Sequence, residues 1–254
     1  MEPSNGQEPK VFIALPSYNG QSASKQLYSL SAIVKKGWLV ASTEFSSLAH
    51  SFNRMWADCL NRKRTEGFTH FVMCHSDIVP AGNWIQTLLD EMKTHGADII
   101  SAISPIKDHL GITSTGRMRP DVKCIERFTM RQVYQLPETF TFPDIVLNTG
   151  CMCVNLAFPF VEQLFFRFQD WIEKNEKGEF VARTVSEDWL FSADAASMGA
   201  KLYATRKVKL EHIGTMHFGT HGPWGQCPND PNFPDSVIDQ AIQLQGPQKQ
   251  IIVP

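Results

Sequence analysis

The sequence lacks the features of membrane proteins and of disulfide-rich secreted proteins. It contains no run of residues long and apolar enough to span a bilayer, and its most apolar stretch, residues 156–168, is interrupted by a proline and by charged residues. Its six cysteines are few and scattered, unlike those of a disulfide scaffold. Residues 1–10 are polar and do not have the apolar core of a signal peptide. We therefore expect a cytoplasmic protein without a membrane span.

A strong charge of either sign is also missing. The 24 lysines and arginines nearly balance the 26 acidic residues, which gives a formal net charge of −2 at pH 7. This balance argues against a dedicated nucleic-acid-binding protein. The sequence has neither internal repeats nor low-complexity tracts. Its 254 residues, 43% of them hydrophobic, are enough to bury a substantial core.

The first hundred residues alternate apolar runs with amphipathic segments. Strands are predicted at residues 11–15, 38–42, 69–74 and 97–103, and helices at residues 22–36, 52–60 and 83–95. This alternation with short connections predicts an α/β fold, in which helices cover both faces of a mainly parallel central sheet. Ligands bind such sheets at the carboxyl ends of the strands.

The regular alternation ends after residue 104. Residues 105–147 contain few helical or strand patterns longer than a handful of residues. Beyond them the sequence predicts an apolar segment, two helices and a strand, at residues 151–154, 159–173, 187–198 and 201–209. From residue 215 the chain is rich in glycine, proline, asparagine and aspartate, which predicts a loop packed on the domain.

Three groups of residues in this pattern could carry chemistry. His75 and Asp77 follow a buried strand on the same side of the chain, where they could hold a divalent cation or form an ordinary Asx-turn. Glu187 and Asp188 open a predicted helix, where they could be catalytic carboxylates or simple helix-capping acids. His212 follows the last predicted strand, and a single histidine is commonly structural.

The order of these motifs resembles the GT-A glycosyltransferases, particularly their family-2-like members. The resemblance covers residues 10–214 and rests on the first strand and its loop, the strand ending in His75-Ser-Asp77, the segment 148–152 (NTGCM), the Glu-Asp pair and the final histidine. It implies a metal-dependent transferase of the hexosyltransferase type that moves a sugar from a UDP- or GDP-sugar to an acceptor. Inverting members of the family use a carboxylate of the Glu-Asp pair as the base.

Carried over residue by residue, the resemblance implies a complete set of site residues. The donor would be bound by Pro16, Ser17, Tyr18, Glu44, Asn53, Arg54, Ser76, Asp77 and Gly150. Asp77 and His212, with His75, would hold Mn²⁺ or Mg²⁺, which acts as a Lewis acid on the departing diphosphate. Asp188 would be the catalytic base, and Glu187 would hydrogen-bond the acceptor.

The sequence departs from the family pattern at two of these positions. His75 stands where the family has the first aspartate of an Asp-x-Asp motif, and Phe52-Asn53 stands where it has an Arg-Asn pair, with Arg54 displaced by one step. The implied organisation is a polar tail at residues 1–9, a catalytic domain at residues 10–214 and a loop-rich tail at residues 215–254. Within the domain, residues 10–104 would bind the nucleotide and residues 105–214 the acceptor.

Two other classes of protein remain as alternatives. A sugar-nucleotide nucleotidyltransferase would share the fold, but it would carry a glycine-rich loop with Arg and Lys after the first strand, whereas residues 16–20 contain one glycine and no cation. A non-catalytic carbohydrate- or nucleotide-sugar-binding protein would keep Tyr18 and the pocket without needing Asp188. Such a binding protein would be distinguished from an enzyme by a turnover assay, because it would not convert a donor.

The acceptor is not named by these motifs. Residues 105–133 hold six cations (Lys107, Arg117, Arg119, Lys123, Arg127 and Arg131) and three acids (Asp108, Asp121 and Glu126), a net charge of +3. This segment indicates either an anionic acceptor, including a modified nucleic-acid base, or an ordinary solvated loop. Trp224, in a Gly-Pro-Trp-Gly loop, has a flat apolar face suited to a sugar, but it could equally anchor the loop.

Overall fold

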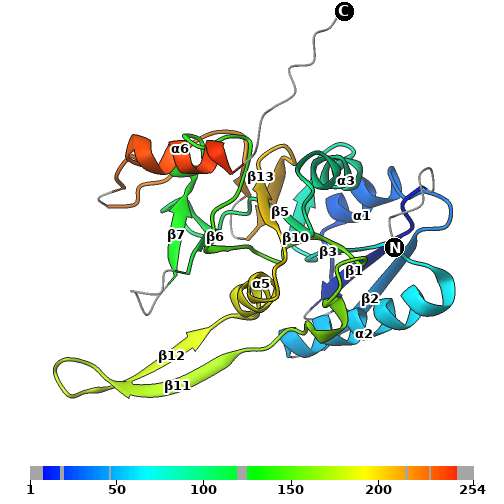
Figure 1. Cartoon of the computed structure of the whole chain (residues 1–254), viewed down its shortest axis with the longest axis horizontal. Helices are drawn as coiled ribbons and strands as arrows, with labels where there is room; N and C mark the ends of the chain where they lie inside the picture. The colour runs from blue at the N-terminus through cyan, green and yellow to red at the C-terminus, as the bar shows by residue number, and fades with distance from the viewer. Residues whose placement is uncertain are drawn as a thin grey trace, which may run out of the picture.

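The chain folds around a seven-stranded central sheet (Figure 1). The computed structural model describes residues 8–17, 20–45, 47–118, 125–214, 217–228 and 230–244. In spatial order, the strands are β2 (Leu39–Glu44), β1 (Val11–Ser17), β3 (His70–Cys74), β10 (Cys151–Asn155), β5 (Ile99–Ala102), β13 (Leu202–Thr205) and β8 (Thr139–Phe140). Only β10 and β8 run against the others, so the sheet is mainly parallel, as the sequence predicts.

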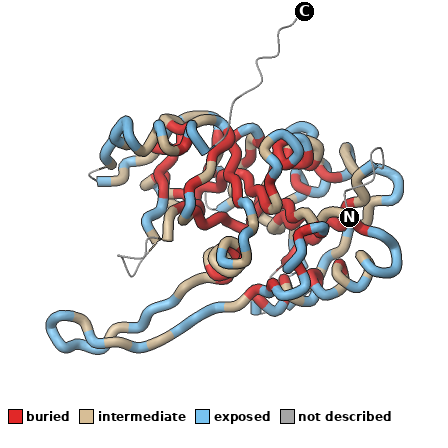
Figure 2. Tube along the Cα trace, viewed as in Figure 1, coloured by how far each residue is buried: buried red, intermediate tan, exposed pale blue. Residues whose placement is uncertain are grey.

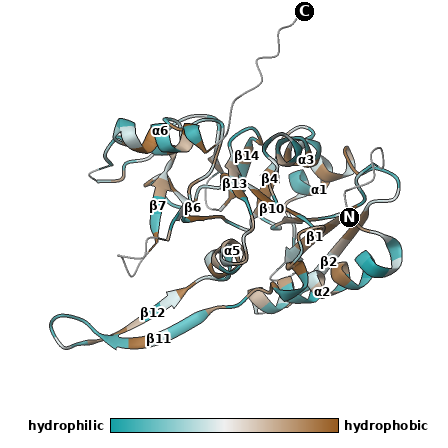
Figure 3. Ribbon diagram, in the orientation of Figure 1, coloured by the Kyte–Doolittle hydropathy of each residue, from teal (hydrophilic) through white to brown (hydrophobic). Residues whose placement is uncertain are grey.

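Helices cover both faces of this sheet because side chains alternate along each buried strand. In β1, Phe12 and Ala14 point to the face covered by α2 (Leu48–Glu66) and α5 (Glu187–Ser197). Val11, Ile13 and Leu15 point to the opposite face, which is covered by α1 (Ser24–Ser31) and α3 (Trp84–His95). The period of two along a strand thus separates two hydrophobic cores. Figures 2 and 3 show the buried and hydrophobic residues gathered on the central strands.

Two small antiparallel sheets flank the central one. The first contains β15 (His217–Gly219), β14 (Leu210–Ile213) and β4 (Ile78–Pro80), in that order. The second contains β7 (Glu126–Thr129), β6 (Ile112–Arg117) and β9 (Ile145–Val146), and the short helix α4 (Met130–Val133) follows β7. The second sheet and α4 lie within residues 105–147, the segment in which the sequence shows little regular pattern.

The helix predicted at residues 159–173 is wrong. The structure has one turn of 3-10 helix, η1 (Val161–Gln163), and then extended chain. In this extended chain Leu164 and Phe166 are buried, whereas Phe165 between them is half exposed, which is the alternation of a strand. The apolar residues were dense enough to fit a helical pattern as well, so periodicity alone could not distinguish the two.

Side chains from α2 hold this extended segment in place. The Asn53 amide donates to the carbonyl of Phe166 at 2.7 Å and accepts from its N–H at 2.8 Å. The indole N–H of Trp56 donates to the carbonyl of Leu164 at 2.8 Å. These bonds satisfy backbone groups that a helix would pair internally.

The extended segment leads into a two-stranded hairpin that projects from the body of the protein (Figure 1). Its strands are β11 (Gln169–Lys174) and β12 (Phe180–Val185), and they pair with each other. Figure 2 shows that most of the hairpin is exposed or only half-buried.

The C-terminal segment contains regular structure where the sequence predicts a loop. β15 extends the sheet that contains β14, and α6 (Asp235–Gln243) follows further along the chain. Ala241 of α6 is buried, and Val237 and Ile238 pack against the same hydrophobic core as α2 and α5. In the described part of the chain, no helix is long and apolar enough to cross a membrane.

Candidate functional site

A cavity of about 530 Å³ lies at the carboxyl ends of β1 and β2. Ser17, Ser42, Thr43 and Glu44 are among its lining residues. The chain leaves β1 toward β2 on one side and then returns to β3 on the other, so this edge is a topological switch point, where parallel sheets bind ligands. Two predicted donor-binding residues, Ser17 and Glu44, therefore line one cavity.

Backbone hydrogen bonds join the loops that follow β1 and β3. The N–H of Ser76 donates to the carbonyl of Pro16 at 3.3 Å, and the carbonyl of Ser76 accepts from Ala23 at 2.9 Å. The N–H of His75 donates to the carbonyl of Gly150 at 2.9 Å. The structure thus brings Pro16, Ser76 and Gly150 to the same edge as the cavity. Tyr18 lies outside the described residues.

Asp77 and His212 meet at this edge because β4 and β14 are paired. Oδ2 of Asp77 lies 3.5 Å from Nε2 of His212 and 2.5 Å from Nζ of Lys107. Burial of Asp77 opposes ionisation, but the hydrogen bonds from His212 and Lys107 outweigh it and hold the pKa of Asp77 well below its usual range. Asp77 is therefore a carboxylate at neutral pH.

The hydrogen bonding of His212 suits a metal ligand. Its Nδ1 lies 2.7 Å from the carbonyl oxygen of Pro105, which can only accept, so Nδ1 carries the proton. In the neutral ring, Nε2 then has a lone pair that faces the Asp77 carboxylate. Oδ2 of Asp77 and this Nε2 lie 3.5 Å apart, close enough for both to bind one divalent cation. Asp77 and His212 would therefore supply two ligands to a divalent cation.

His75 does not join this pair. Among the described residues no group of three or more His, Cys, Asp or Glu side chains is arranged to hold a metal. The His75 ring packs against Phe52, with ring centres 4.9 Å apart, and its Nε2 lies 3.3 Å from Oγ1 of Thr149. Burial lowers the pKa of His75 to about 4, so its ring is neutral at pH 7.

Thr149 connects His75 to Asp188. The Thr149 hydroxyl donates to Oδ1 of Asp188 at 2.5 Å, so its oxygen is left to accept a hydrogen bond from His75. The result is a chain of hydrogen bonds from His75 through Thr149 to the carboxylate. Asp188 is thus held by the segment before β10, which the simple capping interpretation does not predict. Ser186, at the N-cap of α5, makes no side-chain capping bond.

The two carboxyl groups at the start of α5 differ in their protonation. Burial raises the pKa of Asp188 to about 6, although its bonds to Thr149 and the charge of Arg127 oppose the rise. Burial, and then the neighbouring Asp188 charge, raise the pKa of Glu187 further, to about 8. Burial and the repulsion between the two groups therefore favour one proton on the pair, with Glu187 the more readily protonated of the two. Such a pair offers a proton acceptor beside a neutral hydrogen-bond donor.

Two predicted donor-binding residues are placed differently. Both hydrogen-bonding ends of the Asn53 amide are used by the backbone of Phe166. Arg54, the next residue of α2, is exposed. The structure therefore gives Asn53 a role in fixing the chain before β11 and does not bring it to Asp77.

The basic segment does not form one continuous cationic surface in the described residues. Arg117 pairs with Asp144 at 2.7 Å, and Arg131 donates to the carbonyl of Gly225 at 3.1 Å. Lys107 pairs with Asp77, and Arg127 lies over the ring of Trp189. Arg119, Asp121 and Lys123 lie outside the described residues.

Comparison with known proteins shows similarity at the level of the fold. No protein-family model matches the chain, and no curated protein sequence matches it. Among solved structures, A197 from STIV is similar with a TM-score of 0.54 and 14% identity, over 89% of this chain and 97% of that one. The likeness to A197 concerns the fold alone.

Two further structures match with TM-scores below 0.5. S. aureus TarS 1-349, solved in complex with UDP-GlcNAc, has a TM-score of 0.45 and 11% identity, over 78% of this chain and 56% of its own. A glycosyltransferase involved in glycosylation of the major capsid of PBCV-1 has a TM-score of 0.33 and 13% identity, over 61% of this chain and 63% of its own. The predicted α/β architecture, a mainly parallel sheet between helices, is confirmed.

Proposed function

We propose that the chain is a metal-dependent glycosyltransferase that moves a sugar from a UDP- or GDP-sugar to an acceptor hydroxyl, with inversion. One observation carries this proposal: the cavity beside Ser17 and Glu44, the Asp77–His212 pair and the Thr149-bound Asp188 belong to one edge of the sheet. Nucleotide binding, charge neutralisation and proton transfer need these three kinds of group in that proximity.

Each part of the edge has a separate task in the proposed reaction. The cavity at β1 and β2 holds the nucleoside, within the proposed nucleotide-binding half at residues 10–104. Asp77 and His212 hold Mn²⁺ or Mg²⁺, which supplies Lewis acidity to the diphosphate. Lys107, whose ammonium group touches Asp77, adds positive charge beside the phosphates.

Asp188 takes the proton of the attacking hydroxyl. As that proton moves to the carboxylate, the acceptor oxygen bonds to the anomeric carbon. The bond from this carbon to the diphosphate breaks, and its electron pair leaves with the nucleoside diphosphate. Thr149 and, through it, His75 fix the direction of the Asp188 carboxylate. Protonated Glu187 donates a hydrogen bond to the acceptor or the sugar.

The proposal is tested by supplying UDP- and GDP-sugars with Mn²⁺ and measuring released nucleoside diphosphate. We expect slow hydrolysis of at least one donor without any acceptor, and we expect a chelator to abolish it. Nucleotide binding without turnover of any donor would contradict the proposal and indicate a binding protein. Formation of a nucleotide sugar from a nucleoside triphosphate and a sugar phosphate would instead indicate a nucleotidyltransferase.

A further inference from the structure

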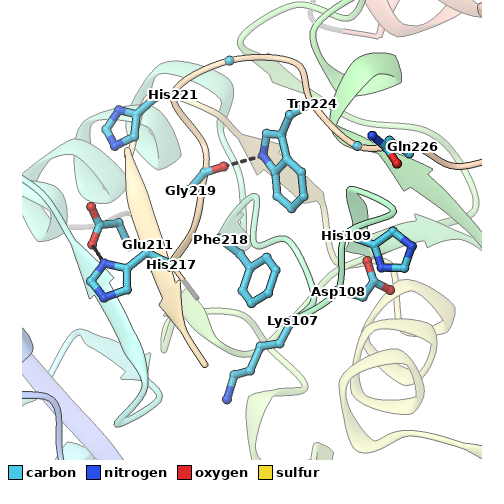
Figure 4. Close-up of a pocket in the computed structure, with 12 residues that line it drawn as sticks. Lys107, Asp108, His109, Glu211, His217, Phe218, Gly219, His221, Trp224 and Gln226 are labelled. Carbon is cyan, nitrogen blue, oxygen red and sulfur yellow. Dashed lines mark hydrogen bonds and ion pairs between the residues drawn. The ribbon is translucent and has the colours of Figure 1, made fainter. Parts of the chain in front are cut away.

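A second and larger cavity, of about 810 Å³, begins at Lys107 (Figure 4). Its walls come from β14, from β15 and from the loops at residues 107–109 and 219–226. Because Lys107 also contacts Asp77, the cavity adjoins the proposed reaction centre. None of the tasks assigned above uses it.

The loop that carries Trp224 is fixed in position. The α-carbon of Gly111 packs so closely against Gly225 and the carbonyl of Trp224 that a side chain at either glycine would clash with backbone. The N–H of Gln226 donates to the carbonyl of His109 at 3.2 Å. The Trp224 indole N–H donates to the carbonyl of Gly219 at 2.7 Å (Figure 4). The cavity wall is therefore preformed, which lowers the entropic cost of binding a ligand.

The lining combines aromatic rings with charged and uncharged polar groups. The rings of Trp224 and Phe218 lie 28° from parallel, with centres 6.0 Å apart, and both face the cavity. Glu211 accepts from His217 at 2.9 Å. Among the described lining residues Lys107 is the sole lysine or arginine, against the two acids Asp108 and Glu211. This balance gives no attraction for a polyanion.

We propose that this cavity binds the acceptor as a neutral saccharide, with Trp224 as the surface on which one sugar ring packs. This inference rests on the proposed transferase function and names the substrate class. A cavity of this size accommodates a short oligosaccharide. The apolar face of a pyranose ring matches the flat indole, and Asp108, Glu211 and Gln226 can bond its hydroxyls. The excess of acids over lysine and arginine in the lining favours a neutral acceptor over the anionic acceptor that the basic segment allows.

The test measures direct binding of neutral tetrasaccharides of glucose, N-acetylglucosamine, mannose and galactose by titration calorimetry. At least one should bind with little dependence on salt. Trp224→Ala should weaken this binding by roughly tenfold or more, the effect of losing a buried aromatic contact. Trp224→Phe should retain most of it. Trp171→Ala, which removes a tryptophan outside the cavity, is the matched control and should leave saccharide binding unchanged.

Other outcomes would overturn the inference. The first is failure of all four tetrasaccharides to bind. The second is unchanged binding by a Trp224→Ala variant whose unfolding temperature shows that it is folded. The third is tight, salt-sensitive binding of a heparin tetrasaccharide or of single-stranded DNA instead. Saccharide binding is measured without a donor. Failure of the transferase proposal, seen as absent donor turnover, is therefore distinguishable from failure of this one.

An independent observation concerns the projecting hairpin. One face of it carries Asp170, Ile172 and Lys174 from β11, opposite Thr184, Ala182 and Phe180 from β12, and all six are exposed. Ile172 is 72% and Phe180 73% exposed. Within the described residues no third strand pairs with the hairpin. An isolated two-stranded hairpin is only marginally stable in water, so this face and its edges suit a partner.

The sequence of β11 is complementary to itself. If β11 pairs antiparallel with β11 of a second copy and Ile172 lies opposite Ile172, Asp170 of each copy lies opposite Lys174 of the other. Cross-strand pairs of opposite charge stabilise a sheet, and this pairing forms two of them around an apolar centre. A slip of one residue would place Asp170 opposite Glu173 in one direction and Ile172 opposite Glu173 in the other. The charge pattern therefore selects one register.

We infer that the protein forms a symmetric dimer in which two hairpins join through β11 into a four-stranded sheet. Sedimentation velocity over a concentration series should show a monomer–dimer equilibrium. Asp170→Lys alone and Lys174→Asp alone each create two like-charge pairs, and each should weaken dimerisation by roughly tenfold or more. The double variant Asp170→Lys/Lys174→Asp restores opposite pairs and should restore the dimer. A monomeric wild type, or a double variant as weak as the single ones, would overturn the inference.

Discussion

Replacing Asp188 with asparagine is expected to reduce sugar transfer by roughly 10²- to 10⁴-fold, the usual contribution of a positioned general base. Asparagine keeps the shape of the side chain and can still accept the hydrogen bond from Thr149, but it cannot take a proton. The measurement is kcat for transfer in parallel with the dissociation constant of the donor. Donor binding should persist, because the proposed mechanism assigns the nucleoside to the cavity beside Ser17 and Glu44 and the diphosphate to the metal.

Stability provides the control for this variant. Folding raises the pKa of Asp188. Above about pH 6 its carboxyl group is ionised in both the folded and the unfolded protein, and burying the charge then lowers the free energy of unfolding. This loss of stability disappears as the pH falls and the folded protein binds the proton. Asp188→Asn removes the ionisable group and should leave stability at pH 7 unchanged or slightly higher. A variant that unfolds, or one that turns over at nearly the wild-type rate, would show that Asp188 is a structural residue.

The raised pKa of Asp188 sets the pH dependence that the proposed mechanism predicts. If Asp188 is the base, the acid limb of the rate profile should have its midpoint near pH 6 rather than near the value of an ordinary aspartate, about 4. Thr149→Val removes a hydrogen bond that lowers the pKa of Asp188, and it should move this limb to higher pH. Glu187→Gln preserves a neutral donor and should reduce transfer much less than Asp188→Asn.

Replacing Asp77 with alanine is expected to abolish the cooperation between metal and nucleotide. In the wild type, Mn²⁺ and UDP or GDP together should raise the unfolding temperature by more than the sum of their separate effects, since each ligand completes the site of the other. Asp77→Ala removes one of the two proposed protein ligands of the metal. Transfer should fall by about 10²-fold or more, because the departing charge would lose its Lewis acid.

A matched control separates this effect from a general loss of charge. Asp90 is an exposed acid on α3, and Asp90→Ala should retain the full cooperation between metal and nucleotide. Asp77→Ala also leaves Lys107 and His212 without their carboxylate, so its basal stability should fall. Equal added stabilisation of the wild type and Asp77→Ala would remove the metal from the proposed mechanism.

Local pattern was sufficient to predict the first half of the fold. Val11 to Ala102 alternates strands and helices that are each defined by nearby residues, so periodicity and glycine C-caps such as Gly67 and Gly96 locate them. β10 could be identified as apolar, but its antiparallel insertion between β3 and β5 depends on pairing across more than 50 residues. No short-range signal specifies such a pairing.

The same distinction applies to the site. Asp77, His212 and Asp188 follow or begin regular elements, and so they could be selected from the sequence. The chain of bonds through Thr149 could not, because it depends on where β10 lies beside α5 and β3. His75 was expected to be a metal ligand from its spacing to Asp77, but the structure turns its ring toward Thr149 and Phe52.

In the proposed mechanism, one edge of the sheet holds a metal–diphosphate complex beside a carboxylate base. Diffraction from crystals soaked with Mn²⁺ and UDP or GDP, recorded with anomalous scattering from manganese, tests it most directly. We expect one manganese peak bound to Oδ2 of Asp77 and Nε2 of His212, with the diphosphate completing its coordination and the nucleoside in the cavity beside Ser17 and Glu44. A nucleotide bound elsewhere, or manganese bound away from Asp77 and His212, would contradict it.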